Sequence, residues 1–238
     1  MDKIQRKIWN ENHKRLKEII EKQEHHVEAI QLFLSQHALL HSASIGHPPD
    51  QVTMEDELLN DICEATFRQY PVKTPDTQNS IAWHIWHVTR IEDMTMNILI
   101  ANDQQVLTTD NWLEKLNIPF EHSGNDMSEE ELTSLSANID YNSLRAYRTA
   151  VGKRTQEVIS NVRSGQFQQP ICASKINRLF ADKAVSPNSK WLADYWSKKT
   201  IAGIVLMPGT RHIFLHHNKC LRIKKKYQKK VNHESVQN

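Results

Sequence analysis

The chain has 238 residues, enough to bury a full hydrophobic core without disulfide or metal staples. Its six glycines and eight prolines are few and helix-forming residues recur throughout, which favours a mostly helical protein over a β-sandwich or barrel. The net charge of +2 is unevenly spread, because residues 219–238 hold seven Lys or Arg and one Glu, and this is not the pattern of a globally basic nucleic-acid-binding protein.

The first predicted helix covers residues 8–45, where apolar residues recur at intervals of three and four. His37 and His41 continue the stripe of apolar positions late in this helix. The Gly-His-Pro-Pro stretch at 46–49 ends it. A short helix is then expected over 54–70.

The second main helix is predicted over residues 79–101, with Asn79 or Ser80 as its N-cap. Its inner face places histidines where a core-facing helix normally has leucine. The residues of this face are His84, His87, Ile91, Met94 and Ile98.

A long connection over 102–140 holds a short helix, because Ser128 and Glu131 form a capping-box pattern. The third main helix is predicted over 141–163. Its seam consists of Leu144, Tyr147, Val151, Thr155, Val158 and Val162.

A short helix is expected at 175–183, and the last main helix at 189–226, where Pro208 must kink or interrupt it. Four long helices favour a single bundle domain over 1–226. The basic tail, 227–238, is expected to be disordered.

Three cysteines without a CxxC spacing favour a reduced compartment over a disulfide framework. The N-terminus leads into a charged helix and has no apolar signal core. The longest uncharged apolar run, 200–210, is about half of what a bilayer span requires. The expected location is therefore cytoplasmic, with no membrane partner.

Two histidine pairs have the spacing of metal ligands on helices. His212 and His216 lie four apart, so their side chains share one helix face, and His84 and His87 lie three apart. Neutral imidazole is a common ligand for transition metals. Three histidines with an open position are typical of a catalytic metal site, whereas a structural zinc site has four protein ligands. Each ligand also needs an acceptor for its other ring nitrogen, and Glu92 and Asp93 are the nearest carboxylates in sequence.

The second and last predicted helices resemble those of the DinB/YfiT-like superfamily. The family pattern in the second helix is a His, an aliphatic residue, and an acid five positions after the His; the pattern in the last helix is H-x3-H, often followed by another His. The matching residues are His87, Val88 and Glu92, then His212, His216 and His217. The resemblance implies an up-down-down-up four-helix bundle, a frequent homodimer, and a divalent metal ion (Zn, Ni, Fe or Mn) held by His87, His212 and His216.

The chain is longer than typical members and has additional histidines. His84 is expected to neighbour the metal site rather than bind the ion. His37 or His41 can be a fourth ligand, a hydrogen-bond partner of a ligand or a general base, and a polar helix end is an equal alternative. His41 and His84 are the candidate catalytic residues, for handling a proton or orienting a ligand.

The resemblance implies a metal-dependent enzyme, because some families with this fold are S-transferases that use a low-molecular-weight thiol and others are hydrolases or isomerases. A small-molecule substrate of unknown identity is the expected partner, and nucleic acid is not. The alternative is a stress-induced metal-binding or sensing protein without catalysis. A third reading is a helical interaction module with an empty metal motif.

Overall fold

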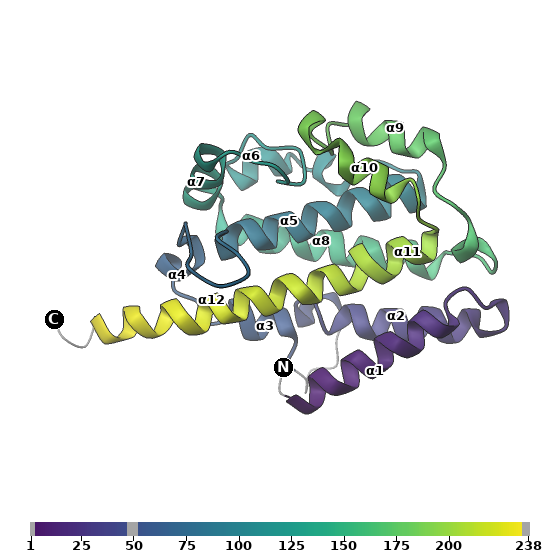
Figure 1. Ribbon diagram of the computed structural model, residues 1–238, viewed down its shortest axis with the longest axis horizontal. Helices are drawn as coiled ribbons and strands as arrows, with labels where there is room; N and C mark the ends of the chain where they lie inside the picture. Colours follow the sequence, from purple (N-terminus) through teal and green to yellow (C-terminus); the bar gives the residue numbers. More distant parts are fainter. Residues whose placement is uncertain (1–2, 47–51, 235–238) are drawn as a thin grey trace.

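The computed structural model describes residues 3–46 and 52–234, and this part of the chain contains helices and no β-strand (Figure 1). Isolated bridges join Thr74 to Thr77 and Pro170 to Thr200. The predicted all-α class is therefore confirmed. The helices are α1 (Lys3–Ile19), α2 (His26–Ala38), α3 (Met54–Leu59), α4 (Glu64–Arg68), α5 (Ile81–Met94), α6 (Trp112–Leu116), α7 (Glu129–Asn138), α8 (Tyr141–Ser160), α9 (Ala173–Ala181), α10 (Lys190–Trp196), α11 (Ile201–Leu206) and α12 (His212–Glu234).

Helix α5 is the central element of the fold. Every one of its residues is buried, and it packs against both α8 and α12. The Ser80 side chain accepts a hydrogen bond from the backbone N–H of Trp83, so the predicted N-cap is confirmed. A π-helical segment, Thr95–Ala101, continues α5. Because α5 is covered on all sides, its polar side chains must find partners inside the protein.

The predicted single helix over 8–45 is wrong, because the chain turns between α1 and α2. Lys22 has an extended backbone at this turn, and α2 folds back along α1 (Figure 1). Arg15 and Glu28 form a two-bond ion pair across the turn. The apolar period continues through both helices and no Gly or Pro stands at 20–25, so the sequence lacks the usual signal for a break. Positions 47–49 of the predicted helix end lie outside the described residues.

The middle of the chain follows the predicted pattern in part. The short helix expected over 54–70 is divided into α3 and α4, and the connection over 102–140 contains α6 as well as the expected α7. The capping box of Ser128 and Glu131 starts α7, and Asp140 caps α8. The short helix expected at 175–183 corresponds to α9. All six residues of the predicted α8 seam are buried, which confirms the face that α8 presents to the core.

The predicted helix over 189–226 is also wrong, because it is divided into α10, α11 and α12. The chain turns after Trp196, and Thr200 caps α11 through the N–H of Gly203. Helix α12 continues past the expected boundary at Lys226 to Glu234. Residues 235–238 of the predicted disordered tail lie outside the described residues.

A π-helical turn, Met207–Arg211, separates α11 from α12 at the predicted Pro208 interruption. Carbonyls near the proline find other partners: the Thr210 hydroxyl donates to Leu206 O at 2.9 Å, and His13 Nε2 lies 3.1 Å from the same oxygen. A side chain at Gly209 would meet Met96 Cε at 2.8 Å. The turn thus packs tightly on the core and begins α12 at His212.

Within the described residues, the core consists of two large apolar clusters and a smaller third, and a buried polar layer lies between the two large ones along α8. Val151 belongs to one cluster and Val158 to the other, while Gly152 and the buried Thr155 stand between them. In the described part of the chain, no helix has the length and apolar character needed to cross a membrane.

Candidate metal centre

The structure brings together three of the histidines singled out by their spacing. His87 comes from the middle of α5, and His212 and His216 come from the first turns of α12. One ring nitrogen from each lies within 4.8 Å of the other two. His87 Nε2 is 3.2 Å from His212 Nε2, and the rings of His212 and His216 are 4.4 Å apart. The two helices therefore place three imidazoles around one point.

The orientation of His87 is fixed by the backbone of a loop. Its Nδ1 lies 2.7 Å from the carbonyl oxygen of Ser123. A carbonyl oxygen can only accept, so Nδ1 carries the hydrogen and Nε2 presents a lone pair toward His212. Trp83 stacks on the ring at 4.5 Å, and its indole N–H donates to Gly124 O. The loop over 123–124 thus sets both the tautomer and the ring plane of His87.

His84 lies directly behind His216. The Nδ1 atoms of the two rings are 2.8 Å apart, and His84 Nε2 is 3.0 Å from the hydroxyl oxygen of Thr77. If His216 presents Nε2 to a metal, its Nδ1–H donates to His84, which then donates through Nε2 to Thr77. Both nitrogens of His84 are engaged, so its geometry is that of an orienting residue.

Burial keeps these imidazoles uncharged at neutral pH. It lowers the pKa of His87 to about 4, although the Ser123 carbonyl acts in the opposite direction. Burial also holds the pKa of His84, His212 and His216 well below the usual value, even though part of the last two side chains is exposed. Neutral imidazole is the form that binds a metal ion.

The donor set fits a divalent transition-metal ion. His87 Nε2, which bears a lone pair, lies 3.2 Å from His212 Nε2. A cation placed between these two nitrogens and the ring of His216 can be bound by all three histidines. Three protein ligands leave coordination positions for another molecule. Among the described residues, His212 Nδ1 has no hydrogen-bond partner.

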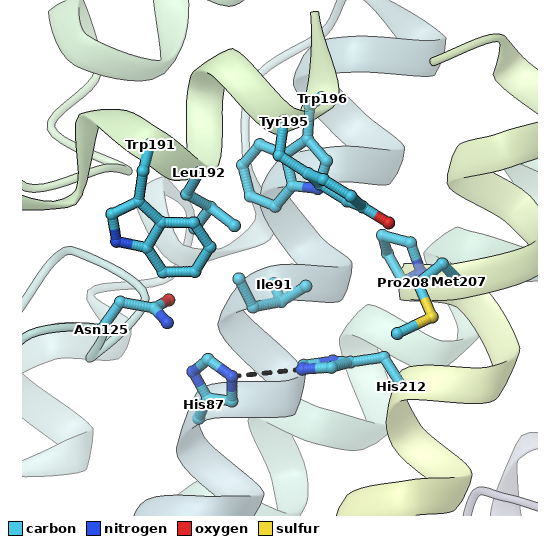
Figure 2. Close-up of a pocket in the computed structure, with 10 residues that line it drawn as sticks. All are labelled: His87, Ile91, Asn125, Trp191, Leu192, Tyr195, Trp196, Met207, Pro208 and His212. Carbon is cyan, nitrogen blue, oxygen red and sulfur yellow. Dashed lines mark hydrogen bonds between the residues drawn. The ribbon is translucent and has the colours of Figure 1, made fainter. Parts of the chain in front are cut away.

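A pocket of about 230 Å³ opens beside His87 and His212. Figure 2 shows the two histidines on one side and the aromatic rings of Trp191, Tyr195 and Trp196 across from them. Trp191 and Tyr195 are 52% and 40% exposed, so they stand at the solvent side, whereas Trp196 is buried. The remaining lining residues are Ile91, Asn125, Leu192, Met207 and Pro208. No Lys, Arg, Asp or Glu is among the lining residues, so the pocket suits an uncharged, apolar group.

His37 and His41 form a separate group with Glu92 instead of joining the three histidines. Their Nε2 atoms lie 2.7 and 3.1 Å from the two carboxylate oxygens. The hypothesis that either one adds a fourth ligand to His87, His212 and His216 therefore finds no support in this arrangement. His41, a candidate catalytic residue, is fully buried with Glu92.

The carboxylates that sequence reasoning paired with the ligands have other partners. Asp93 accepts hydrogen bonds from Arg90 and Tyr147 and from the backbone N–H groups of Val106 and Leu107. Cys220 is buried within an apolar cluster, and burial raises the pKa of its thiol. The acceptor for His87 is a backbone carbonyl, which no sequence pattern reveals.

The pocket wall was also missed. Trp191 and Trp196 stand five apart on α10, inside the helix that the sequence predicted over 189–226. The turn between α10 and α11 carries them over the histidines. No turn was predicted after Trp196, so the position of these residues over the site required the tertiary fold.

Comparison with curated proteins found no match. A family model described as the DinB superfamily matches residues 52–181, more than half of the chain. The matched segment contains His84, His87 and Glu92, whereas His212 and His216 lie beyond it. The match and the all-α fold agree: the chain belongs to the DinB superfamily.

Proposed function

We propose that the protein is a metal-dependent enzyme that transfers or hydrolyses a group on a small, apolar substrate, with His87, His212 and His216 as the metal ligands. The observation that carries this proposal is the pocket of about 230 Å³ that opens onto two of these three imidazoles, the buried His87 and the partly buried His212. A structural metal site is closed by four protein ligands and has no need of such a pocket.

In this reading a bound divalent cation supplies Lewis acidity, which lowers the pKa of a water molecule or a thiol in contact with it. The protein's own groups prepare the site. Ser123 O holds His87 in one tautomer, and His84 orients His216. The apolar walls of Trp196, Leu192 and Ile91 keep water away from a bound substrate.

The thiol-transferase and hydrolase versions differ in what brings the nucleophile. A small thiol would enter through the side bounded by the exposed Trp191 and Tyr195, and its electrophilic partner would rest on the apolar wall. In the hydrolase version, water takes the place of the thiol. The alternative, a metal-binding protein without catalysis, would use the same ligands without a substrate in the pocket.

Metal analysis of the untagged, full-length chain tests the ligand set. After loading with Zn²⁺ or Ni²⁺, we expect His87→Ala to bind one ion per chain fewer than the native protein. His26→Ala, which changes a histidine that is not in either histidine group, should leave the content unchanged. Equal metal content in the native protein and His87→Ala would refute the site.

A thermal-shift screen of the metal-loaded protein tests whether the pocket binds a substrate-like ligand, which an enzyme requires and simple metal binding does not. Small thiols and apolar electrophiles that occupy the pocket should raise the melting temperature of the native protein. The shift should be reduced in Trp196→Ala, which removes a wall of the pocket but no proposed ligand. If no compound of either class produces a shift in the loaded protein, the alternative without catalysis is favoured.

A further inference from the structure

A second group of metal-binding residue types lies inside the helical bundle, away from the pocket. Glu92 follows His87 by five positions, so it points about 140° around α5 from it. It meets His37 from the last turn of α2 and His41 from the turn just beyond. Their side chains are no more than 1% exposed.

The three donors are close enough to share one ion. His37 Nε2 is 2.7 Å from Glu92 Oε1, and His41 Nε2 is 3.1 Å from Glu92 Oε2. One atom from each residue lies within 4.8 Å of the others. The His37 contact has hydrogen-bond geometry, but the His41 contact does not. His41 Nε2 and Glu92 Oε2 therefore lie at ion-pair distance, in an orientation that is poor for a hydrogen bond.

Buried polar atoms without partners are concentrated at this group. Across the described part of the chain, no hydrogen-bond partner is found for His37 Nδ1, for either ring nitrogen of His41, or for Glu92 Oε2. Both ring nitrogens of the fully buried His217 also lack a hydrogen-bond partner. His217 lies near enough to His41 and Glu92 for their charges to influence its pKa. Leaving one such group unsatisfied costs about 1–3 kcal/mol, so a cluster of them calls for a ligand.

The surroundings hold this group in place. A Cβ at Gly152 would lie 2.6 Å from His41 Nδ1, so the His41 ring rests against the backbone of α8. Arg148 is 3.8 Å from Glu92 Oε2, donates to Leu40 O at 3.1 Å and is ion-paired with Glu55. The single positive charge of Arg148 thus faces the carboxylates of both Glu55 and Glu92. A metal cation bound to Glu92 would supply the positive charge that the second carboxylate lacks.

We propose that His37, His41 and Glu92 hold a second divalent transition-metal ion between α2 and α5, separate from the three-histidine centre. Two imidazoles and one carboxylate form a donor set used for Fe²⁺, and the same donor types bind Zn²⁺ and Co²⁺. His217 is the next candidate donor. Because the group is buried on all sides, the ion joins two helices and stabilises the fold.

Ion counting on the untagged, full-length chain tests this assignment. The protein is stripped with a chelator, loaded with Zn²⁺ or Co²⁺, dialysed and measured by mass spectrometry for ions per chain. We expect about two ions for the native protein, one for His87→Ala, one for Glu92→Gln and none for the double variant. Thr155→Val, a buried polar change on α8 in the same layer, should retain two.

The His87→Ala arm keeps the test independent of the folding of Glu92→Gln. His87→Ala should still bind one ion, and Zn²⁺ should raise its melting temperature by several degrees. One ion in the native protein with none in His87→Ala overturns the second site while the three-histidine centre stands. One ion in the native protein with none in Glu92→Gln, but one in His87→Ala, overturns the three-histidine centre and keeps the second site. Two ions in a folded Glu92→Gln protein also overturn the second site.

Discussion

The role of His84 gives a sharp prediction, because the structure places it one hydrogen bond behind a proposed ligand. Replacing His84 by Phe keeps a flat ring against Trp83 but removes the acceptor that lies 2.8 Å from His216 Nδ1. Thr77 loses one partner and still accepts the N–H of Asn79 at 3.1 Å. The change therefore acts mainly on His216.

The expected effect is a weaker metal site. Loss of the group that orients a ligand typically reduces metal affinity about 10–100-fold, which corresponds to about 1.4–2.7 kcal/mol. Loss of one neutral hydrogen bond costs about 0.5–1.5 kcal/mol, which reaches only the lower limit of that range. Removal of a ligand in His87→Ala should abolish binding at this site.

Competitive titration of the metal-free protein with Zn²⁺ and a chromogenic chelator measures these affinities. His26→Phe, at a partly exposed histidine of α2, is the control and should have no effect. Affinity within about threefold of the native protein in His84→Phe would contradict the orienting role. Loss as complete as in His87→Ala would show that His84 is itself a ligand.

Four further predictions follow from the same contacts. Arg148→Met leaves Glu55 and Glu92 without their shared cation and should lower the free energy of unfolding by about 3–5 kcal/mol in denaturant titration, whereas Lys153→Met at an exposed position of the same helix should change it little. Gly152→Ala pushes a methyl group into His41 and should destabilise by about 1–3 kcal/mol; Gly203→Ala in α11 brings its methyl group to 3.3 Å from Lys199 Cβ, a milder contact that should cost less than Gly152→Ala. Burial lowers the pKa of His87 to about 4 and that of His41 to about 3, so below pH 6.5 the unfolded chain binds more protons than the folded one. The free energy of unfolding of the metal-free protein should therefore fall as the pH drops from about 6.5 toward 4, by at most about 1.4 kcal/mol per pH unit for each of these histidines. A free energy of unfolding that is independent of pH in this window would refute their burial in the neutral form. The homodimer that the family resemblance implies would give twice the chain mass in light scattering after size exclusion, and a monomer at all concentrations would reject it.

The sequence determined which residues α8 presents to the core, whereas every residue of α5 is buried and its predicted inner face is only part of what the fold covers. The three-and-four spacing of the α8 seam and the caps at Ser80, Ser128 and Asp140 are local properties, and local physics decides them. The histidine spacing within α12 likewise placed His212 and His216 on one helix face. The family pattern then paired them with His87 correctly in space.

The turns that divide the first and last predicted helices were decided by tertiary packing. No strong breaker stands between α1 and α2, and the apolar period is compatible with one helix or two. The folded-back arrangement buries both helices against the core and is joined by the Arg15–Glu28 pair. Helical spacing reports which side of a helix is apolar, but not where the chain turns to bury it.

Tertiary structure also decided which histidine groups form. His37 and His41 were expected near His87, and α2 does approach α5, but the side of α5 that it meets carries Glu92. The acceptor for His87 comes from a loop carbonyl, and the pocket wall comes from α10, far along the chain. Spacing along one helix fixes the directions of its own side chains, because the backbone geometry is regular. Which groups those side chains meet depends on how separate helices pack, and that is set by the burial of the whole core.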